Sequence, residues 1–390
     1  MSLPHVFQIV AWLVCLCWLY KVAEAAMGLP RIANLLLPEY DRSPSGEPSL
    51  TVIVPARNEA ADIGDCLASL LSQDYPGVQI VAVDDRSTDQ TGAIMDALAA
   101  RYPERLRVLH VQQLPENWLG KTHAMALAAG EVSTDWLLFT DADVLFRPDS
   151  LRRSLAYAVA TGADHHVTLP TTIIKRWDEA ALLGFFQIFG MWATRPWRVA
   201  DPKAKRDAIG IGAFNLIRRE AYEQVGGFEA LRMAVIEDLG LARRIKRAGL
   251  AQRIAFGEGL VSLHWASGAM GLVEVMTKNI FSAFRFSVVL ALIGCGWLGV
   301  FCAAPALGLL YGPTRIAAVF TLLAIWFAYR LYGRFSGISS WQAVLSPFAA
   351  LLLIYTLLRS VVVTLWQGGI VWRGTFYPLA TLRKHSAPLW

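Results

Sequence analysis

The chain has 390 residues, of which 55% are hydrophobic and only 17% charged, with a formal net charge of +5. Its mean hydropathy of +0.41 is too high for an ordinary soluble enzyme. The basic excess does not indicate nucleic-acid binding, because the Lys and Arg residues adjoin apolar segments and form no basic stripe with stacking aromatics.

The five cysteines exclude two kinds of site. Four of them lie in apolar segments, and only Cys66 lies in the part of the chain with a globular composition. There is no CxxC pair and no Cys/His cluster, so the sequence predicts neither a disulfide framework nor a thiolate zinc site. This cysteine usage fits a domain in a reducing cytoplasm.

The N-terminal 40 residues are predicted to be an uncleaved membrane anchor and a linker. Residues 6–20 are uncharged and apolar, and with residues 21–27 they just reach the roughly 20 residues that cross a bilayer. No basic residue precedes them, whereas Lys21 and Arg31 follow, which is unlike a cleavable signal peptide. The positive-inside rule then places the next domain in the cytoplasm, at the inner cell membrane.

Residues 41–270 have the composition of a globular domain in which strand and helix patterns alternate. Apolar, β-branched runs predict strands at 50–54, 79–83, 107–111 and 136–140. Helical patterns follow the first two runs, at residues 60–73 and after Ser87, and cover the intervals between strands. Such alternation predicts an α/β fold with a mostly parallel sheet.

The C-terminal part is predicted to lie in and along a membrane. Within residues 287–372, the segments 287–314, 316–333 and 346–366 are long and apolar enough to span it. Residues 180–193 and 271–286 are shorter, and they are either helices in the membrane interface or buried core helices. Three spans leave the basic tail, residues 373–390, outside the cell, whereas the positive-inside rule places it inside. A re-entrant or interfacial segment would remove this conflict.

Polar groups follow three of the predicted strands at the point where each ends. They are residues 55–59, Asp84 with Asp85, and Asp141 with Asp143. In open parallel sheets the ligand site lies beyond these strand ends. A carboxylate cluster needs a cation, and oxygen ligands suit Mg²⁺ or Mn²⁺, which complete their shells with substrate phosphates. The pattern predicts a metal and a phosphate-bearing substrate, although "DAD" alone is more simply a solvated turn. No P-loop or GxGxxG motif follows the first strand.

Six stretches of the chain, in order, resemble the inverting family 2 glycosyltransferases with a GT-A fold. They are TVIVPARNEAADIGDCLASLLSQDYP, QIVAVDDRSTDQT, WLGKTHAMALAAG, WLLFTDADVLF, GAFNLIRREAYEQVGGF and IEDLGLARRIKRAG. The flanking apolar segments resemble the membrane-bound branch that glycosylates lipids, with hopanoid- and carotenoid-associated enzymes and ceramide glucosyltransferase as relatives. The resemblance implies transfer of one sugar, with inversion, from a nucleotide-sugar donor (by default a UDP-sugar) to a lipid hydroxyl.

The resemblance also implies a role for each matching polar residue. The donor-binding residues would be Pro55, Arg57, Glu59, Asp84, Asp85, Lys121 and Asp141. Asp141 and Asp143 would form the DxD motif that holds the metal on the diphosphate. Asp238 would be the catalytic base, with Glu237 beside it. Without that context, Asp238 is more simply a helix cap or an ion-pair partner of Arg243 or Arg244.

One departure from the family pattern concerns the acceptor side. Processive synthases and ceramide glucosyltransferase-like members carry a (Q/R)xxRW motif, whereas this chain reads VEVMTKNIFSAFRF in that region. The departure argues against a processive polysaccharide synthase and leaves Lys278 and Asn279 as mere candidates for acceptor contacts. His264 is either a metal ligand, a hydrogen-bond donor to phosphate or a structural histidine. A catalytically silent scaffold is a further alternative, against which the intact carboxylates argue.

Overall fold

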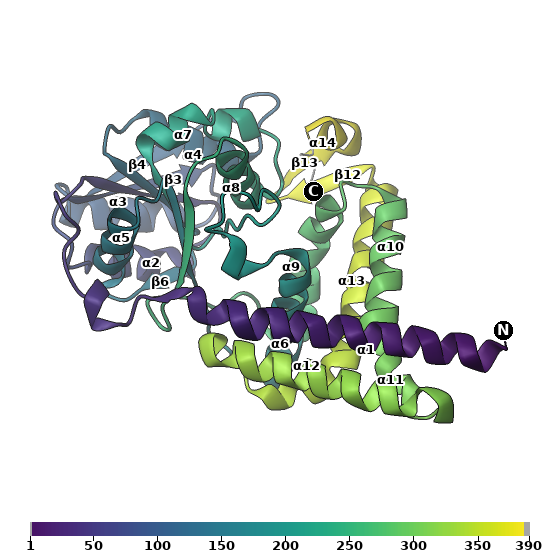
Figure 1. Ribbon diagram of the computed structural model, residues 1–390. Coiled ribbons are helices and arrows are strands. Elements are labelled where there is room, and N and C mark those ends of the chain that lie inside the picture. Colours follow the sequence, from purple (N-terminus) through teal and green to yellow (C-terminus); the bar gives the residue numbers. More distant parts are fainter. Residues whose placement is uncertain (1, 386–390) are drawn as a thin grey trace.

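The computed structural model describes residues 2–385, which form an α/β body and a group of long apolar helices beside it (Figure 1). The strands are β1 (Ala33–Asn34), β2 (Leu50–Ala56), β3 (Val78–Asp85), β4 (Leu106–Val111), β5 (Trp136–Phe139), β6 (Val144–Phe146), β7 (His165–Leu169), β8 (Thr171–Thr172), β9 (Asn215–Arg218), β10 (Gln252–Phe256), β11 (Val261–Leu263), β12 (Gly369–Trp372) and β13 (Thr375–Pro378). The α-helices are α1 (Leu3–Gly28), α2 (Ile63–Leu71), α3 (Thr91–Arg101), α4 (Gly120–Gly130), α5 (Ser150–Ala160), α6 (Trp177–Ala193), α7 (Arg219–Gln224), α8 (Glu237–Arg247), α9 (Gly268–Ala283), α10 (Val288–Leu298), α11 (Ala304–Gly308), α12 (Arg315–Ser336), α13 (Ser346–Gln367) and α14 (Leu379–His385).

The body is built on an eight-stranded sheet in the order β1-β10-β7-β9-β5-β2-β3-β4. Strand β9 runs antiparallel to its neighbours β5 and β7, and the other neighbouring pairs are parallel. Every residue of β2 is buried, as expected for an apolar run that is covered on both faces. The predicted α/β fold with a mostly parallel sheet is confirmed.

Helices cover both faces of this sheet because alternate residues of each strand point to opposite sides. Val52 and Val54 of β2 pack in one core with apolar residues of α2, α3 and α5. Ile53 between them packs in a second core with residues of α4, α7 and α8. The two cores hold the strands rigidly, so the loops at the strand ends have a fixed base.

The sheet register brings the predicted polar groups to one edge. Ala56 at the end of β2 pairs with Asp84 of β3, and Ile53 of β2 pairs with Phe139 of β5. The residues that follow β2, β3 and β5 therefore leave the sheet side by side. A small second sheet, β6-β11-β8, begins directly after Asp143 and fixes the far side of this turn.

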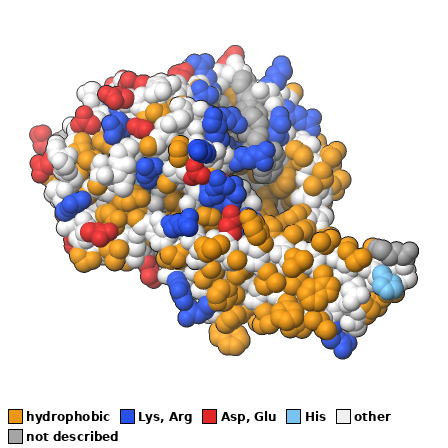
Figure 2. Space-filling model, viewed as in Figure 1, with side chains coloured by type: hydrophobic (Ala, Val, Ile, Leu, Met, Phe, Trp, Pro, Cys, Tyr) orange, Lys and Arg blue, Asp and Glu red, His pale blue; other side chains and the backbone are white. Residues whose placement is uncertain are grey.

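In the part of the chain that the structure describes, four helical segments are long and apolar enough to cross a membrane: Leu3–Arg31, Val288–Gly308, Gly312–Ser336 and Ser340–Gln367. They coincide with the anchor and the three C-terminal spans expected from the sequence. In Figure 1, α1 lies along α12, and this pair crosses the pair formed by α10 and α13. Hydrophobic side chains dominate the surface over α1 and α12, and Lys and Arg gather between this surface and the body (Figure 2).

Helices α6 and α9 lie between the body and the apolar helices. They correspond to the two shorter apolar stretches of the sequence, and they pack on each other and on α13. The core that contains them also includes Trp18 of α1, Ile254 of β10 and Tyr329 of α12. A continuous apolar core therefore joins the body to the helices.

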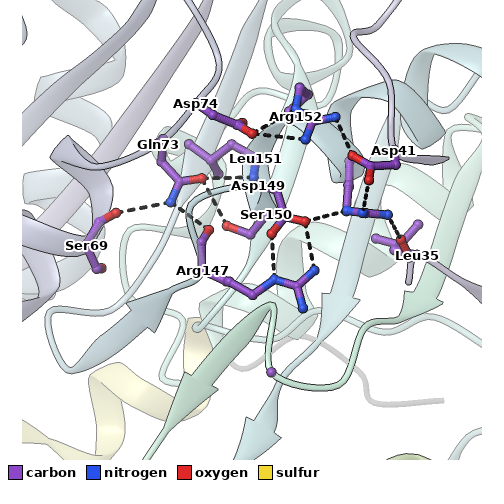
Figure 3. Close-up of polar contacts among 12 residues, drawn as sticks. Leu35, Asp41, Ser69, Gln73, Asp74, Arg147, Asp149, Ser150, Leu151 and Arg152 are labelled. Atoms are coloured by element: carbon purple, nitrogen blue, oxygen red, sulfur yellow. Dashed lines mark hydrogen bonds and ion pairs between the residues drawn. The ribbon is translucent and has the colours of Figure 1, made fainter. Parts of the chain in front are cut away.

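The linker between α1 and β2 is tied to the body by a polar network (Figure 3). Arg153 of α5 donates a hydrogen bond to the carbonyl of Leu35 at 2.9 Å and contacts the Asp41 carboxylate at 2.6 Å. Arg152 contacts the same carboxylate at 2.8 Å and Asp74 at 3.0 Å. The Arg153 side chain is only 9% exposed, so this network is more than a loose surface pair.

A hairpin of β12 and β13 follows the last apolar helix. Gly368 ends α13 in the left-handed conformation, with a φ of 70°. Arg373 and Gly374 form the hairpin turn, and both have positive φ angles, 46° and 78°. The basic tail expected from residue 373 thus begins inside a structured turn, which brings the chain back to the body.

Candidate active site

Lys121 joins the two acidic motifs that the sequence singles out. Its Nζ lies 2.6 Å from the Asp141 carboxylate and 2.6 Å from that of Glu237. Lys121 is the second residue of α4, and Glu237 is the first residue of α8, so three elements meet at this ammonium group. Burial opposes the charged form, but the carboxylates of Asp141 and Glu237 raise the pKa of Lys121 above its usual value. The lysine is therefore charged and offsets part of the negative charge.

The two carboxylates of the DxD pair have different environments. The Asp141 backbone N–H donates to the Gly212 carbonyl at 3.0 Å, and its carboxylate is the one that meets Lys121. Burial, followed by the nearby charges of Asp141 and Glu59, raises the pKa of Asp143 to about 6. Within residues 2–385, no Lys, Arg or His pairs with Asp143.

This donor set fits a hard divalent cation. Among the described residues there is no group of three or more His, Cys, Asp or Glu side chains that could hold a metal alone. Mg²⁺, however, commonly takes one or two carboxylates and completes its shell with substrate phosphates. Asp143, a half-buried carboxylate with no cationic partner among residues 2–385, and the nearby Asp141 suit that arrangement.

Glu237 and Asp238 begin α8 and face the same region. Burial, followed by the charge of Glu237, raises the pKa of Asp238 to about 7. Asp238 Oδ1 accepts a hydrogen bond from the Leu239 backbone N–H at 2.7 Å. In the described part of the chain it forms no ion pair with an arginine, and Arg244 instead donates to the Val225 carbonyl at 2.7 Å. The hydrogen bond from the Leu239 N–H lies in the first turn of α8, as expected for a carboxylate at a helix N-terminus, whereas no ion pair with Arg243 or Arg244 is found among residues 2–385.

Two glycines permit the close packing of this site. A Cβ added to Gly210 would lie 2.0 Å from the Asp238 carbonyl oxygen. A Cβ added to Gly212 would lie 2.4 Å from Asp141 Oδ2 and 3.2 Å from Lys121 Nζ. Gly210 and Gly212 are thus required for the close approach of the backbone to the carboxylates.

Asp84 and Asp85 point to opposite faces of β3. Asp85 is paired with Arg86 at 2.8 Å and faces α4, where a Cβ added to Gly120 would lie 2.1 Å from its Oδ2. Asp84 faces α3 and contacts His110 Nδ1 at 3.1 Å. Adjacent strand residues alternate in direction, so only Asp85 lies on the side of Lys121.

The loop after β2 meets the C-terminal hairpin, which the sequence reasoning missed. Arg373 forms an ion pair with the Glu59 carboxylate and donates to the Arg57 carbonyl at 3.2 Å. The Arg57 side chain donates to Thr375 Oγ1 at 3.3 Å. Burial raises the pKa of Glu59, and the charge of Arg373 opposes that rise. The hairpin thus covers two residues that are expected to bind the donor. Tyr377 of the hairpin also contacts α4, because its hydroxyl accepts a hydrogen bond from the Gly120 N–H at 3.3 Å.

The remaining candidates lie apart from this centre. His264 Nε2 lies 3.4 Å from Glu179, a buried carboxylate that accepts from the Gly268 N–H at 2.8 Å. This places His264 at the junction of α6 and α9 and not on the DxD pair. Lys278 is exposed on α9, and the buried Oδ1 of Asn279 has no hydrogen-bond partner within the described range.

Comparisons with known proteins bear on the family and the fold. Residues 51–226 match the model of Glycosyl transferase family 2. The chain is 27% identical over 237 residues to 4,4'-diaponeurosporenoate glycosyltransferase of Staphylococcus aureus, covering 60% of this chain and 60% of that relative. The match therefore spans 60% of the curated relative's length, which is less than two thirds.

A solved structure shares the fold. The mannosyltransferase PcManGT from Pyrobaculum calidifontis, in complex with GDP-Man and Mn²⁺, is 19% identical, with a TM-score of 0.51. The likeness covers 93% of this chain and 99% of that one, so it includes helices outside residues 51–226. Residues 51–226 of this chain therefore match a glycosyltransferase family 2 domain, and the likeness to PcManGT shows the GT-A fold.

Proposed function

We propose that this chain transfers a single sugar from a nucleotide-sugar donor to a lipid acceptor at a membrane surface, with inversion of the anomeric carbon. The observation that carries the proposal is the contact of Lys121 with both Asp141 and Glu237. It joins the expected donor-phosphate end of the site to the expected catalytic base, Asp238. A scaffold without activity would not require three charged side chains at one point.

Asp141 and Asp143 would hold Mg²⁺ or Mn²⁺ together with the donor diphosphate. When bound, the cation offsets the negative charge that develops on the leaving oxygen. Lys121 supplies a fixed positive charge to the same region. That PcManGT was solved with Mn²⁺ and GDP-Man supports this assignment.

Asp238 would remove the proton from the acceptor hydroxyl. Glycosidases need a carboxylic acid to protonate a poor leaving group, but a nucleoside diphosphate leaves as an anion, so one base suffices. A base works best when its pKa is near the working pH, and burial brings that of Asp238 to about 7. Attack from the face opposite to the diphosphate inverts the anomeric carbon.

The lipid nature of the acceptor is supported by the architecture and by a relative. Lifting a lipid tail out of a bilayer costs about 0.8 kcal/mol per CH₂ group, so an enzyme for such an acceptor must work at the membrane surface. The body is joined to four helices of membrane-spanning length, and the relative from Staphylococcus aureus is named for a diaponeurosporenoate acceptor. We place the body on the cytoplasmic side of the inner membrane.

The test is nucleotide release by the full chain in nanodiscs with Mn²⁺. UDP-, GDP- and TDP-sugars are supplied with a hydroxyl-bearing or a carboxylate-bearing lipid, and the product is analysed by mass. We expect release with one nucleotide, a gain of one sugar, and loss of both in Asp141→Ala/Asp143→Ala. A ladder of products would indicate a processive synthase. No release and no thermal stabilisation with any donor would refute the proposal and favour a scaffold.

A further inference from the structure

A row of buried polar side chains lies behind the catalytic carboxylates. His165 of β7, Asn215 of β9 and Gln252 of β10 are 0%, 2% and 1% exposed. The sheet register places Gln252 directly opposite His165. Gln252 Nε2 lies 2.7 Å from His165 Nδ1, and His165 Nε2 is hydrogen-bonded to Asn215 Oδ1. Polar groups at this depth are costly unless they are paired, and each of these finds a partner.

The direction of every hydrogen bond in this row follows from one backbone group. The Ile209 N–H can only donate, and it donates to Gln252 Oε1 at 3.2 Å. The Gln252 amide nitrogen is then the donor to His165 Nδ1. The ring proton must therefore sit on His165 Nε2 and be donated to Asn215 Oδ1. Burial lowers the pKa of His165 to about 4, so the ring is neutral and keeps this one tautomer at neutral pH.

The row ends at a small cavity beside the catalytic residues. The cavity is lined by Asn215, Lys121, Glu237 and Asp238, among others, and has a volume of about 10 Å³, about the space of one water molecule. Because Asn215 Oδ1 accepts the hydrogen bond from His165, only the side-chain NH₂ group of Asn215 is left to donate a hydrogen bond into the cavity. No acceptor for that group is found in residues 2–385.

We propose that Asn215 is a positioning residue for Asp238 and that its side-chain N–H donates, through one water in this cavity, to the carboxylates at the start of α8. The inference rests on the proposed function of Asp238 as the base. The same row also reaches the backbone below that residue, because Ile209 precedes Gly210, which packs against the Asp238 carbonyl. The row would thus hold the Asp238 side chain by a hydrogen bond and its main chain by the packing of Gly210.

The alternative is a self-contained polar core that contributes only to stability, and paired variants distinguish the two. Asn215→Asp keeps the shape and the acceptor for His165 but removes the N–H donor. A hydrogen bond to a charged group corresponds to about 10- to 100-fold in rate. We therefore expect kcat for nucleotide release to fall by that factor, with the donor KM within about twofold of wild type.

The row itself is tested at His165. Its glutamine variant, His165→Gln, can accept from Gln252 and donate to Asn215, so it retains kcat, whereas His165→Leu loses it. The matched control is His166→Leu, since His166 is equally buried on the same strand and its Nε2 bonds to Thr168 at 3.0 Å, outside the row. This control should lower the melting temperature without lowering kcat.

The outcomes separate this inference from the proposed function. If wild-type protein releases no nucleotide, the proposed function fails. If wild-type protein is active and Asn215→Asp stays within threefold of it, the inference is overturned. Equal loss of kcat in His165→Gln and His165→Leu would overturn it as well, and so would a loss in His166→Leu that matches that of His165→Leu. Should Asn215→Asp not fold, the His165 pair decides alone.

Discussion

Replacing Gly210 by alanine is the sharpest test of how Asp238 is held. The added Cβ would lie 2.0 Å from the Asp238 carbonyl oxygen, 2.4 Å from its carbonyl carbon and 2.9 Å from the Leu239 nitrogen. All three are main-chain atoms, so no side chain can rotate to make room. Cβ atoms essentially never come closer than 3.0 Å to other heavy atoms. The loop and the start of α8 must therefore separate by about 1 Å.

A shift of this size has a predictable effect on the rate. Misplacing a catalytic group by about 1 Å costs about 10²-fold. We expect Gly210→Ala to lower kcat for nucleotide release by about that factor. The donor contacts expected at β2 and β3 are untouched, so stabilisation by Mn²⁺ and nucleotide should persist. Gly130→Ala is the control, because its added Cβ meets no atom within 4 Å at the end of α4.

Two results would refute this reasoning. Folded Gly210→Ala protein that turns over within threefold of wild type would show that the Asp238 backbone is not fixed by this contact. Loss of donor-dependent stabilisation together with kcat would show that the change damages the site generally. The control should keep its rate and be at least as stable as wild type, because alanine adopts the backbone conformation of Gly130 without strain.

Three further predictions concern protons, metal and the hairpin. Because Asp238 must be deprotonated to act as a base and its pKa is raised to about 7, kcat/KM should fall about tenfold per pH unit below pH 7. A kcat/KM that stays constant down to pH 5 would contradict this role. EDTA should abolish nucleotide release. Because the pKa of metal-free Asp143 is raised to about 6, Mn²⁺ binding measured by calorimetry should weaken below that pH as the carboxylate takes up a proton. A metal affinity that does not change from pH 7 to 5 would exclude Asp143 as a ligand. Arg373→Ala should raise the donor KM several-fold with little change in kcat, since it removes the ion pair by which the hairpin covers Glu59. The control Lys205→Ala, on an exposed loop, should change neither constant. An unchanged KM in Arg373→Ala would show that the hairpin is not part of the donor site.

The edge of the sheet that carries the candidate site was predictable because its signals are local. The apolar run at 50–54 is continuous, as strands buried on both faces require, and it corresponds to the fully buried β2. Parallel strands end at a common edge, which brings Asp85 and Asp141 to the same side as Lys121. Successive residues of a strand point to opposite faces, so the sequence also indicates that Asp84 and Asp85 lie on opposite sides of β3. Grouping the two as one donor-binding pair, because they are adjacent in the sequence, did not take this alternation into account.

The other half of the site depends on contacts that no local pattern reports. Arg373 and Glu59 are 314 residues apart in sequence, and the only hints of a turn were the glycines after the last apolar span. His165 and Gln252 form a pair only because β7 and β10 are neighbours in the sheet. Their strands lack the long β-branched run that marks β2. Burial and pairing of such polar residues are decided by tertiary packing, which overrides local propensity.

The two ends of the chain attach to the body on different sides of the sheet, and this bears on how a lipid could reach Asp238. Near the N-terminus, the linker after α1 is held by Arg153 through Leu35 and Asp41. Near the C-terminus, α13 continues into the hairpin that contacts Glu59 and Gly120. With two such attachments, and with α6 and α9 packed between, the body cannot rotate freely above the helices. The site would therefore keep a fixed height over the bilayer, which suits an acceptor whose tail stays in the membrane while its head group reaches the base.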